Sequence, residues 1–370
     1  MKFNLFMQKL NMANSLDVLT LLFNAAAEVQ SANCLFLLDE NTSTNQLDHL
    51  SRFDAPYVIS NRFDIYQHAL TVVKDSNRVY FSDFDVQALP EHFFDCIVYR
   101  VSKEKALTHW CLNTISERLS PSGKLLVGGK KEDGLKSYVK NCNKQLGLRG
   151  KEKKYGNNYL AHLRPCADFS REESNKLDDK NYKDLRTIGE AFGSALQSKP
   201  GLFGWDKIDE GSALLAHCLK HYLQQENCQS AEMSALDLGC GYGYLALALH
   251  DANFKRIIAT DNNAAALLCC QLNLSLAGSA DFEVIASDCG DKLQERVDFI
   301  LCNPPFHSGF DNDTALTSKF VEAASMRLKP GGSALFVVNA FIPIEKVAKR
   351  YFKRCEALHN NKRFKVLLLQ

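Results

Sequence analysis

The sequence has neither a large net charge nor a long apolar segment, and each absence excludes a class of protein. It carries 44 Lys and Arg against 43 Asp and Glu, a formal net charge of +1. This balance excludes a strongly cationic protein that binds nucleic acid indiscriminately. No apolar stretch approaches the roughly 20 residues of a membrane span, and polar residues interrupt the first apolar segment, unlike a signal peptide. We therefore expect a cytoplasmic protein with no membrane segment.

The sequence also has no CxxC pair, although it contains 13 cysteines. Structural zinc sites commonly use such pairs, so the scattered cysteines predict no metal site. Cys111, Cys240 and Cys302 lie inside apolar runs, where free cysteine packs as a small hydrophobic residue. We expect free thiols in a reducing compartment.

The length of 370 residues favours two domains. Residues 168–190 are rich in charge and poor in large apolar side chains, which is typical of a connector. We predict a first domain over 1–165, a linker over 166–190 and a second domain over 191–370.

Strands that alternate with helices in both halves predict parallel sheets and an α/β fold. Helical spacing of Leu16, Leu19, Leu22 and Phe23 predicts a first helix from a cap at Ser15. Short apolar runs predict buried strands at 34–38, 57–59, 79–81, 95–99 and 124–127, and then at 235–238, 256–260, 282–286, 298–302, 334–338 and 364–369.

The two halves also resemble each other in sequence. FDCIVYR, a helix and LSPSGKLLVGG in the first half correspond to VDFILCNPPF, a helix and LKPGGSALFVV in the second. This predicts an internal duplication. The first copy lacks a glycine-rich turn and has Arg100-Val101-Ser102-Lys103 in place of Asn303-Pro304-Pro305-Phe306. We therefore expect a non-catalytic first copy that supports the structure or docks the substrate.

A glycine-rich turn follows the first strand of the second half. Asp237 precedes Gly239, Gly241 and Gly243, and a helical run begins directly after them. Both dinucleotide and methyl-donor sites have such a turn, but this spacing is GxGxG and not GxGxxG. S-adenosylmethionine carries an amino-acid head, a ribose and a sulfonium cation but no pyrophosphate, so a carboxylate beside the turn favours the methyl donor. We predict that these four residues bind it.

Two further acidic residues end the next two predicted strands. Asp261 lies 20 residues after Gly241 and can accept hydrogen bonds from both ribose hydroxyls, with Asn262 beside it in the predicted site. Asp288 ends the third strand, where it could meet the adenine amino group. Either residue alone would more often be a solvated strand end. Their occurrence on successive strands favours a nucleoside site.

Asn303-Pro304-Pro305-Phe306 directly follows the fourth strand of the second half. The side-chain oxygen of Asn303 and the backbone oxygen of Pro304 can accept hydrogen bonds from an exocyclic base amine, and the prolines fix the loop. Phe306 can stack on a base removed from its helix. We predict that these four residues are catalytic and that Asn303 also borders the cofactor. The chemistry needs alignment and no covalent intermediate.

In these motifs the chain resembles class I (Rossmann-like) S-adenosylmethionine-dependent methyltransferases, duplicated with a degenerate first copy. PGLF, IDEGS, DLGCGYG, NPPFHSG and VVNAFIP occur in this order and resemble the ribosomal RNA guanine-N2 methyltransferases. The resemblance implies methylation of a guanine in small-subunit 16S ribosomal RNA, within the 30S subunit or an assembly intermediate, or else in 23S ribosomal RNA. It also implies that Phe203, Asp206 and Asp209 lie over the donor and that His307 and Asn339 border the guanine.

Other functions stay open on the sequence alone. A protein glutamine N5-methyltransferase would use the same Asn-Pro-Pro chemistry, whereas a nicotinamide oxidoreductase or a non-catalytic binding module would not. Two basic clusters, Lys130–Lys154 and Lys346–Lys365, could contact phosphates or be ordinary solvated surface.

Overall fold

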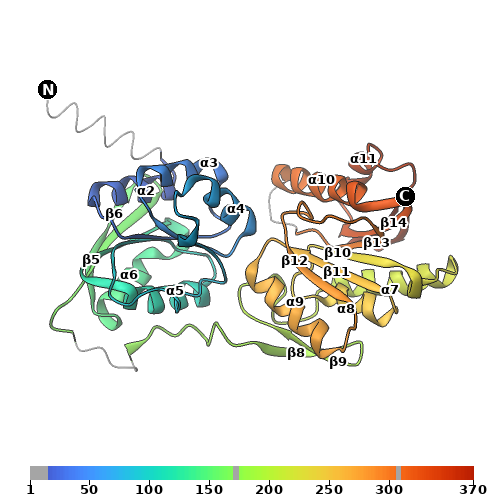
Figure 1. Ribbon diagram of the computed structural model, residues 1–370, viewed down its shortest axis with the longest axis horizontal. Coiled ribbons are helices and arrows are strands. Elements are labelled where there is room, and N and C mark those ends of the chain that lie inside the picture. The colour runs from blue at the N-terminus through green and yellow to red at the C-terminus, as the bar shows by residue number, and fades with distance from the viewer. Residues whose placement is uncertain (1–15, 170–174, 306–309) are drawn as a thin grey trace. The chain divides into compact units, whose positions relative to one another are not determined.

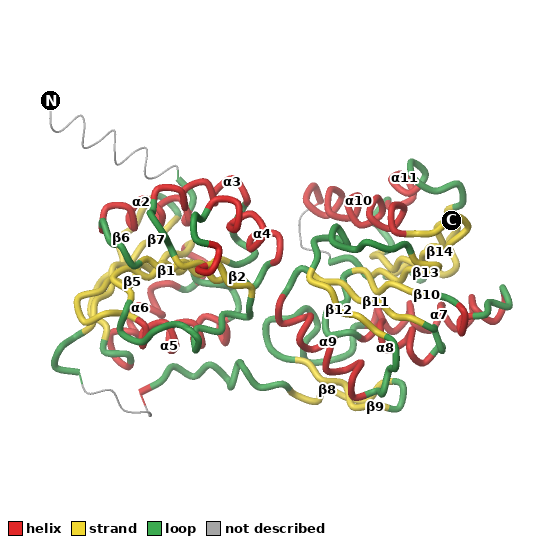
Figure 2. Tube along the Cα trace, in the orientation of Figure 1, coloured by secondary structure: helices red, strands yellow, loops and turns green. Residues whose placement is uncertain are grey.

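The computed structural model describes residues 16–169, 175–305 and 310–370, and only the backbone of 310–315. The chain divides after Tyr182 into two compact units. Each unit is a seven-stranded sheet with helices on both faces, as Figures 1 and 2 show. Each sheet buries one apolar cluster on each of its two faces.

The first unit contains β1 (Cys34–Leu38), β2 (Tyr57–Ser60), β3 (Val79–Phe81), β4 (Phe94–Arg100), β5 (Leu119–Lys130), β6 (Leu148–Tyr155) and β7 (Asn158–Pro165). Their order is β3-β2-β1-β4-β5-β7-β6. The first five are parallel, and β7 pairs antiparallel with both β5 and β6. One face carries α2 (Val18–Val29), α3 (Thr44–Leu47) and α4 (Phe63–Val72), and the other carries α5 (Lys105–Arg118) and α6 (Leu135–Gln145).

The second unit repeats this arrangement with β10 (Ser234–Leu238), β11 (Arg256–Asp261), β12 (Phe282–Ala286), β13 (Val297–Cys302), β14 (Leu328–Asn339), β15 (Cys355–Asn360) and β16 (Phe364–Leu369). Their order is β12-β11-β10-β13-β14-β16-β15, and β16 pairs antiparallel with both β14 and β15. One face carries α7 (Glu210–Gln225), α8 (Tyr244–Asp251) and α9 (Ala264–Leu276), and the other carries α10 (Phe310–Arg327) and α11 (Ile344–Ala348). A hairpin, β8 (Arg186–Ala191) and β9 (Ser194–Ser198), precedes α7.

The predicted duplicated α/β fold and its parallel strands are confirmed, with two corrections. The first helix among the described residues begins at Val18, and its cap is Asp17, because the Asp17 carboxylate accepts from the backbone N–H groups of Leu19 and Thr20. The predicted cap, Ser15, lies outside the described residues. The predicted linker is also too long. Leu177 and Tyr182 are buried in the first core, and β8 lies within the predicted linker range.

The carboxyl ends of the parallel strands place the polar residues of the second unit along one edge of its sheet. β10, β11, β12, β13 and β14 all run in the same direction, so the residues that follow them meet at that edge. All 13 cysteines are free thiols. None of the described helices has the length and apolar character needed to cross a bilayer.

Candidate active site

The glycine turn after β10 has the left-handed backbone that its sequence predicts. Gly239, Gly241 and Gly243 have φ angles of 82°, 52° and 89°. Residues with a side chain rarely adopt such positive φ angles. At Gly243 a Cβ atom would lie 2.8 Å from Sγ of Cys270 on α9, so the turn and helix pack too closely for any side chain. The turn therefore brings its backbone to the edge of the sheet and against α9.

Asp237 is fully buried on β10, directly before this turn. Neither carboxylate oxygen has a hydrogen-bond partner among the described residues. Burial raises the pKa of Asp237 to about 8, and the backbone N–H of Ala246, which falls short of a hydrogen bond, lowers it only in part. A buried carboxylate without a partner is costly, so this residue is complementary to a cation that binds beside it.

Asp261 ends β11 and joins two turns of the site. One oxygen accepts from the backbone N–H of Gly241 at 2.9 Å, and the other accepts from the N–H of Asn263 at 2.8 Å. Each carboxylate oxygen has a second lone pair, so Asp261 can hold the glycine turn and still accept from a ligand hydroxyl. Asn262 lies beside it and is half-buried.

Asp288 follows β12 at the same edge, and its carboxylate forms an ion pair with Lys319 of α10. An amino group of a ligand would therefore share this carboxylate with Lys319. The sequence interpretation did not include Lys319, because the contact joins residues 31 positions apart on different elements.

Asn303 follows β13, and its side-chain amide is held in one orientation. Its Nδ2 donates to Oδ2 of Asp209 at 2.9 Å and to Oγ of Ser212 at 2.8 Å. Pro304 is buried and Pro305 half-buried behind it. With both amide hydrogens engaged, Oδ1 is the group that Asn303 presents as an acceptor.

The remaining predicted site residues are less closely gathered. Phe203 precedes α7 and is 66% exposed. Asn339 ends β14, the strand beside β13, and is half-buried at the same edge. Phe306 and His307 lie outside the described residues. Ser212 was missed as a site residue, although an Asp three positions before it is a common signal for a helix cap.

Two family models match this chain. The "Methyltransferase small domain" model covers residues 193–368. The "Methyltransferase small domain N-terminal" model covers residues 17–151. The two matched segments lie in different units of the fold, the second and the first respectively.

Two similar relatives carry the name Ribosomal RNA small subunit methyltransferase C. The protein from Shewanella loihica is 30% identical over 278 residues, which are 74% of this chain and 76% of the relative. That from Pseudomonas aeruginosa is 29% identical over 294 residues, 77% and 81% of the two chains. Among solved structures, the T. thermophilus 16S rRNA N2 G1207 methyltransferase in complex with AdoMet and guanosine matches with a TM-score of 0.78 and 23% identity, over 96% of this chain and 92% of that one. This similarity shows a shared fold across both units.

Proposed function

The chain belongs to the family of ribosomal RNA small subunit methyltransferase C, and on that premise we propose that it transfers a methyl group from S-adenosylmethionine to N2 of one guanine in 16S ribosomal RNA. The observation that carries the proposal is the fixed side-chain amide of Asn303, which lies at the same edge of the sheet as the glycine turn. An acceptor held there suits an exocyclic amine. The solved protein with guanosine and AdoMet has the same fold.

The residues at the edge of the second sheet fit S-adenosylmethionine. The buried carboxylate of Asp237, which has no hydrogen-bond partner among the described residues, suits the ammonium group of its amino-acid part, and Asp261 suits its ribose hydroxyls. Gly239 and Gly241 allow the backbone to approach the ligand closely. Asp288 would meet the adenine. When bound, the cofactor supplies an electrophilic methyl group whose carbon–sulfur bond breaks as the amine attacks, leaving a neutral thioether.

Asn303 acts on the amine. The N2 lone pair of guanine is delocalised into the ring, so the amino group is a weak nucleophile. A hydrogen bond to Oδ1 of Asn303 fixes the amine's direction and stabilises the positive charge that nitrogen gains in the transition state. The backbone oxygen of Pro304 is the second proposed acceptor. Phe306, His307 and Asn339 complete the proposed guanine site, and the nitrogen finally releases one proton to solvent.

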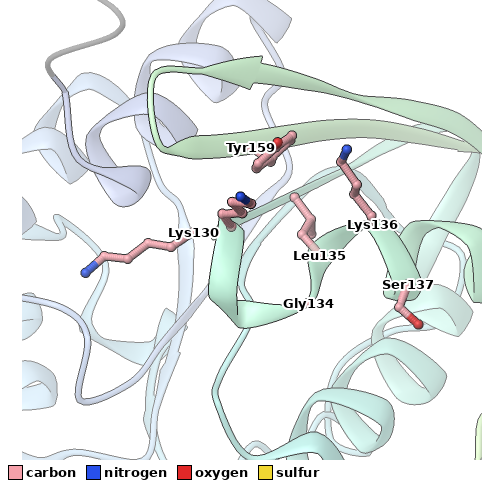
Figure 3. Close-up of a pocket in the computed structure, with 7 residues that line it drawn as sticks. Lys130, Gly134, Leu135, Lys136, Ser137 and Tyr159 are labelled. Atoms are coloured by element: carbon pink, nitrogen blue, oxygen red, sulfur yellow. The ribbon is translucent and has the colours of Figure 1, made fainter.

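A basic pocket in the first unit supports contact with the phosphates of RNA. It has a volume of about 320 Å³ and is lined by Lys130, Lys131, Lys136, Ser137 and Tyr159, among others. Nζ of Lys136 lies 5.0 Å from the centre of the Tyr159 ring, and Figure 3 shows the two side chains near each other. Among the described residues, no carboxylate lies within ion-pair distance of these three lysines. Their charge is therefore available to an anionic partner.

The second basic cluster is less suited to this role. Three of its eight cationic side chains form ion pairs, Arg354 with Glu356, Arg363 with Glu210 and Lys365 with Glu345. Among the described residues, none of the eight lysines of the first cluster forms such a pair. We assign the first cluster to 16S ribosomal RNA within the 30S subunit or an assembly intermediate in the cytoplasm.

Mapping of methylguanosine in ribosomal RNA tests the proposal. RNA from cells with and without the gene is digested and analysed by mass spectrometry, and purified protein is then added back to the unmethylated RNA or subunits. We expect one N2-methylguanosine to disappear from 16S RNA and to return. Loss of a site in 23S RNA, or methylation of a glutamine in a protein, would contradict the assignment. The seven-stranded first unit already differs from the small helical domain that the glutamine enzymes are expected to have.

A further inference from the structure

We infer that Asp209 and Ser212, at the start of α7, are positioning residues that set the orientation of the catalytic Asn303 amide. This inference rests on the proposed function. The amide of asparagine can turn by 180° with little change in shape, which exchanges its donor and acceptor. A turned amide would present N–H groups to an amine that itself carries hydrogens. The chain must therefore select one orientation.

The contacts of Nδ2 make that selection. An ionised carboxylate only accepts hydrogen bonds, so the group that faces Asp209 at 2.9 Å must be the NH2 of Asn303. Oγ of Ser212, 2.8 Å away, accepts the second hydrogen. Asp209 also polarises the amide toward Oδ1, which strengthens the acceptor as positive charge develops on the amine.

The start of α7 is built to hold Asp209 in this place. Its carboxylate caps the helix by accepting from the backbone N–H of Ser212 at 2.8 Å. At Gly211 a Cβ atom would lie 3.1 Å from Oδ2 of Asp209, so a larger residue would press on the carboxylate. The Ser212 side chain is buried with only 8% exposure. One carboxylate thus fixes both a helix end and a side chain 94 residues later.

Asp209→Ser tests this role, because serine is a good helix cap but its shorter side chain cannot span the distance to Asn303. We expect kcat to fall about 10- to 100-fold. Family resemblance places Asp209 over the donor, but its Oδ2 already accepts from Ser212 and Asn303. We therefore expect the affinity for S-adenosylmethionine, measured by calorimetry, and KM for the RNA to stay within about threefold. In Asp209→Asn the side-chain oxygen can still accept a hydrogen bond from Nδ2 of Asn303, so this variant should retain most of the wild-type kcat. Ser212→Ala should give a smaller loss than Asp209→Ser.

The matched control is Asp17→Ala, which removes the cap of α2 in the first unit and touches no predicted site residue. If Asp209→Ser retains wild-type kcat, or if its loss of activity is matched by a loss of donor affinity, the positioning role is wrong. If wild-type protein methylates no guanine, the proposed function itself has failed. As a readout independent of activity, the Asn303 side-chain amide signals in an NMR spectrum should shift in Asp209→Ser and change less in Asp209→Asn.

Discussion

The two units have the same sheet but differ at the positions where the second unit carries its polar site. Both have the same register shift between their fourth and fifth strands, at Phe94/Cys96 and at Val297/Phe299. This shared irregularity aligns the two sheets residue by residue. By this register, Phe36, Ser60, Arg100 and Lys130 in the first unit occupy the positions of Asp237, Asp261, Asn303 and Asn339 in the second.

At the position of Asp237 the first unit has an apolar residue in place of a carboxylate that is costly to bury. Phe36 is completely buried and packs in the core, whereas both carboxylate oxygens of Asp237 lack a hydrogen-bond partner in the described part of the chain. Arg100 lies 3.5 Å from the buried carboxylate of Asp133, whereas Oδ1 of Asn303 accepts no hydrogen bond from the residues that the structure describes. The comparison indicates that the fold does not require the site, and that the second unit bears an energetic cost for keeping it.

The largest effect should come from mutating the residue at the end of the fourth strand, which is Asn303 in the second unit and Arg100 in the first. Asn303→Ala removes the proposed acceptor, and we expect kcat to fall about 100- to 1000-fold. Affinity for S-adenosylmethionine should change little, because Asn303 is proposed to act mainly on the amine. Methyl transfer to 16S RNA and calorimetric titration measure the two effects.

The corresponding change in the first unit, Arg100→Ala, serves as the control. It should leave kcat within about threefold of the wild type but lower the free energy of unfolding by about 1 to 3 kcal/mol, because Asp133 loses its buried partner. An equal loss of donor affinity and kcat in Asn303→Ala would count against its role on the amine.

Asp237→Asn tests the cost of the buried carboxylate. The raised pKa, about 8, means that the folded protein keeps a proton that the unfolded chain releases, so stability falls as pH rises from about 4 through 8. Asparagine has no proton to release. At about pH 9 we expect the variant to exceed the wild type in stability by about 1 to 3 kcal/mol.

The same variant should bind S-adenosylmethionine about 10- to 100-fold more weakly, since it loses a charge-assisted hydrogen bond. Thermal unfolding at several pH values and calorimetry measure both changes. A wild-type stability that does not fall over this pH range, or unchanged donor affinity in the variant, would show that the carboxylate has another partner.

The comparison also explains which features could be predicted from the sequence. Most of the parallel strands contain short apolar runs buried on both faces, and such runs predict strands in either half. The glycine turn and Asn303 stood out because their residue types are specific for a backbone shape and a chemistry. Five strands were not predicted: β6, β7, β8, β9 and β15. Of these, β6 and β15 each lie at the edge of a seven-stranded sheet, and their sequences, LRGKEKKY and CEALHN, are largely polar.

Contacts between distant segments could not be predicted. Asp209 was connected with the donor only through family resemblance, and nothing in the sequence links it to Asn303. Likewise, the ion pair between Asp288 and Lys319 depends on how α10 packs against the sheet. Local patterns determine elements and turns, but the orientation of a site side chain depends on tertiary packing.

Two substitutions with smaller effects distinguish the packing of the glycine turn against α9 from its backbone conformation. The first unit lacks this turn. Gly243→Ala places a Cβ 2.8 Å from Sγ of Cys270 and also requires a positive φ, so we expect a loss of about 2 to 4 kcal/mol in unfolding free energy. Gly241→Ala meets no atom within 4 Å and should cost only about 1 kcal/mol from its backbone. Denaturant unfolding measures both. Equal losses would indicate that backbone conformation, and not the contact with α9, limits the turn.

The smallest effect concerns the lysines of the pocket beside the end of the first unit's fifth strand. If the pocket beside Lys130 binds phosphate, Lys136→Ala should weaken RNA binding about twofold to fivefold and reduce the slope of log affinity against log salt by about 1. The matched control is Lys74→Ala, since Lys74 is an exposed lysine of the same unit already paired with Asp54 at 2.7 Å. Because residues of the first unit line the pocket and residues of the second unit form the proposed methyl-transfer site, kcat and donor affinity should be unchanged in both variants. Identical salt slopes for the two variants would mean that the degenerate unit contributes structure alone, and that the RNA is held by the second unit.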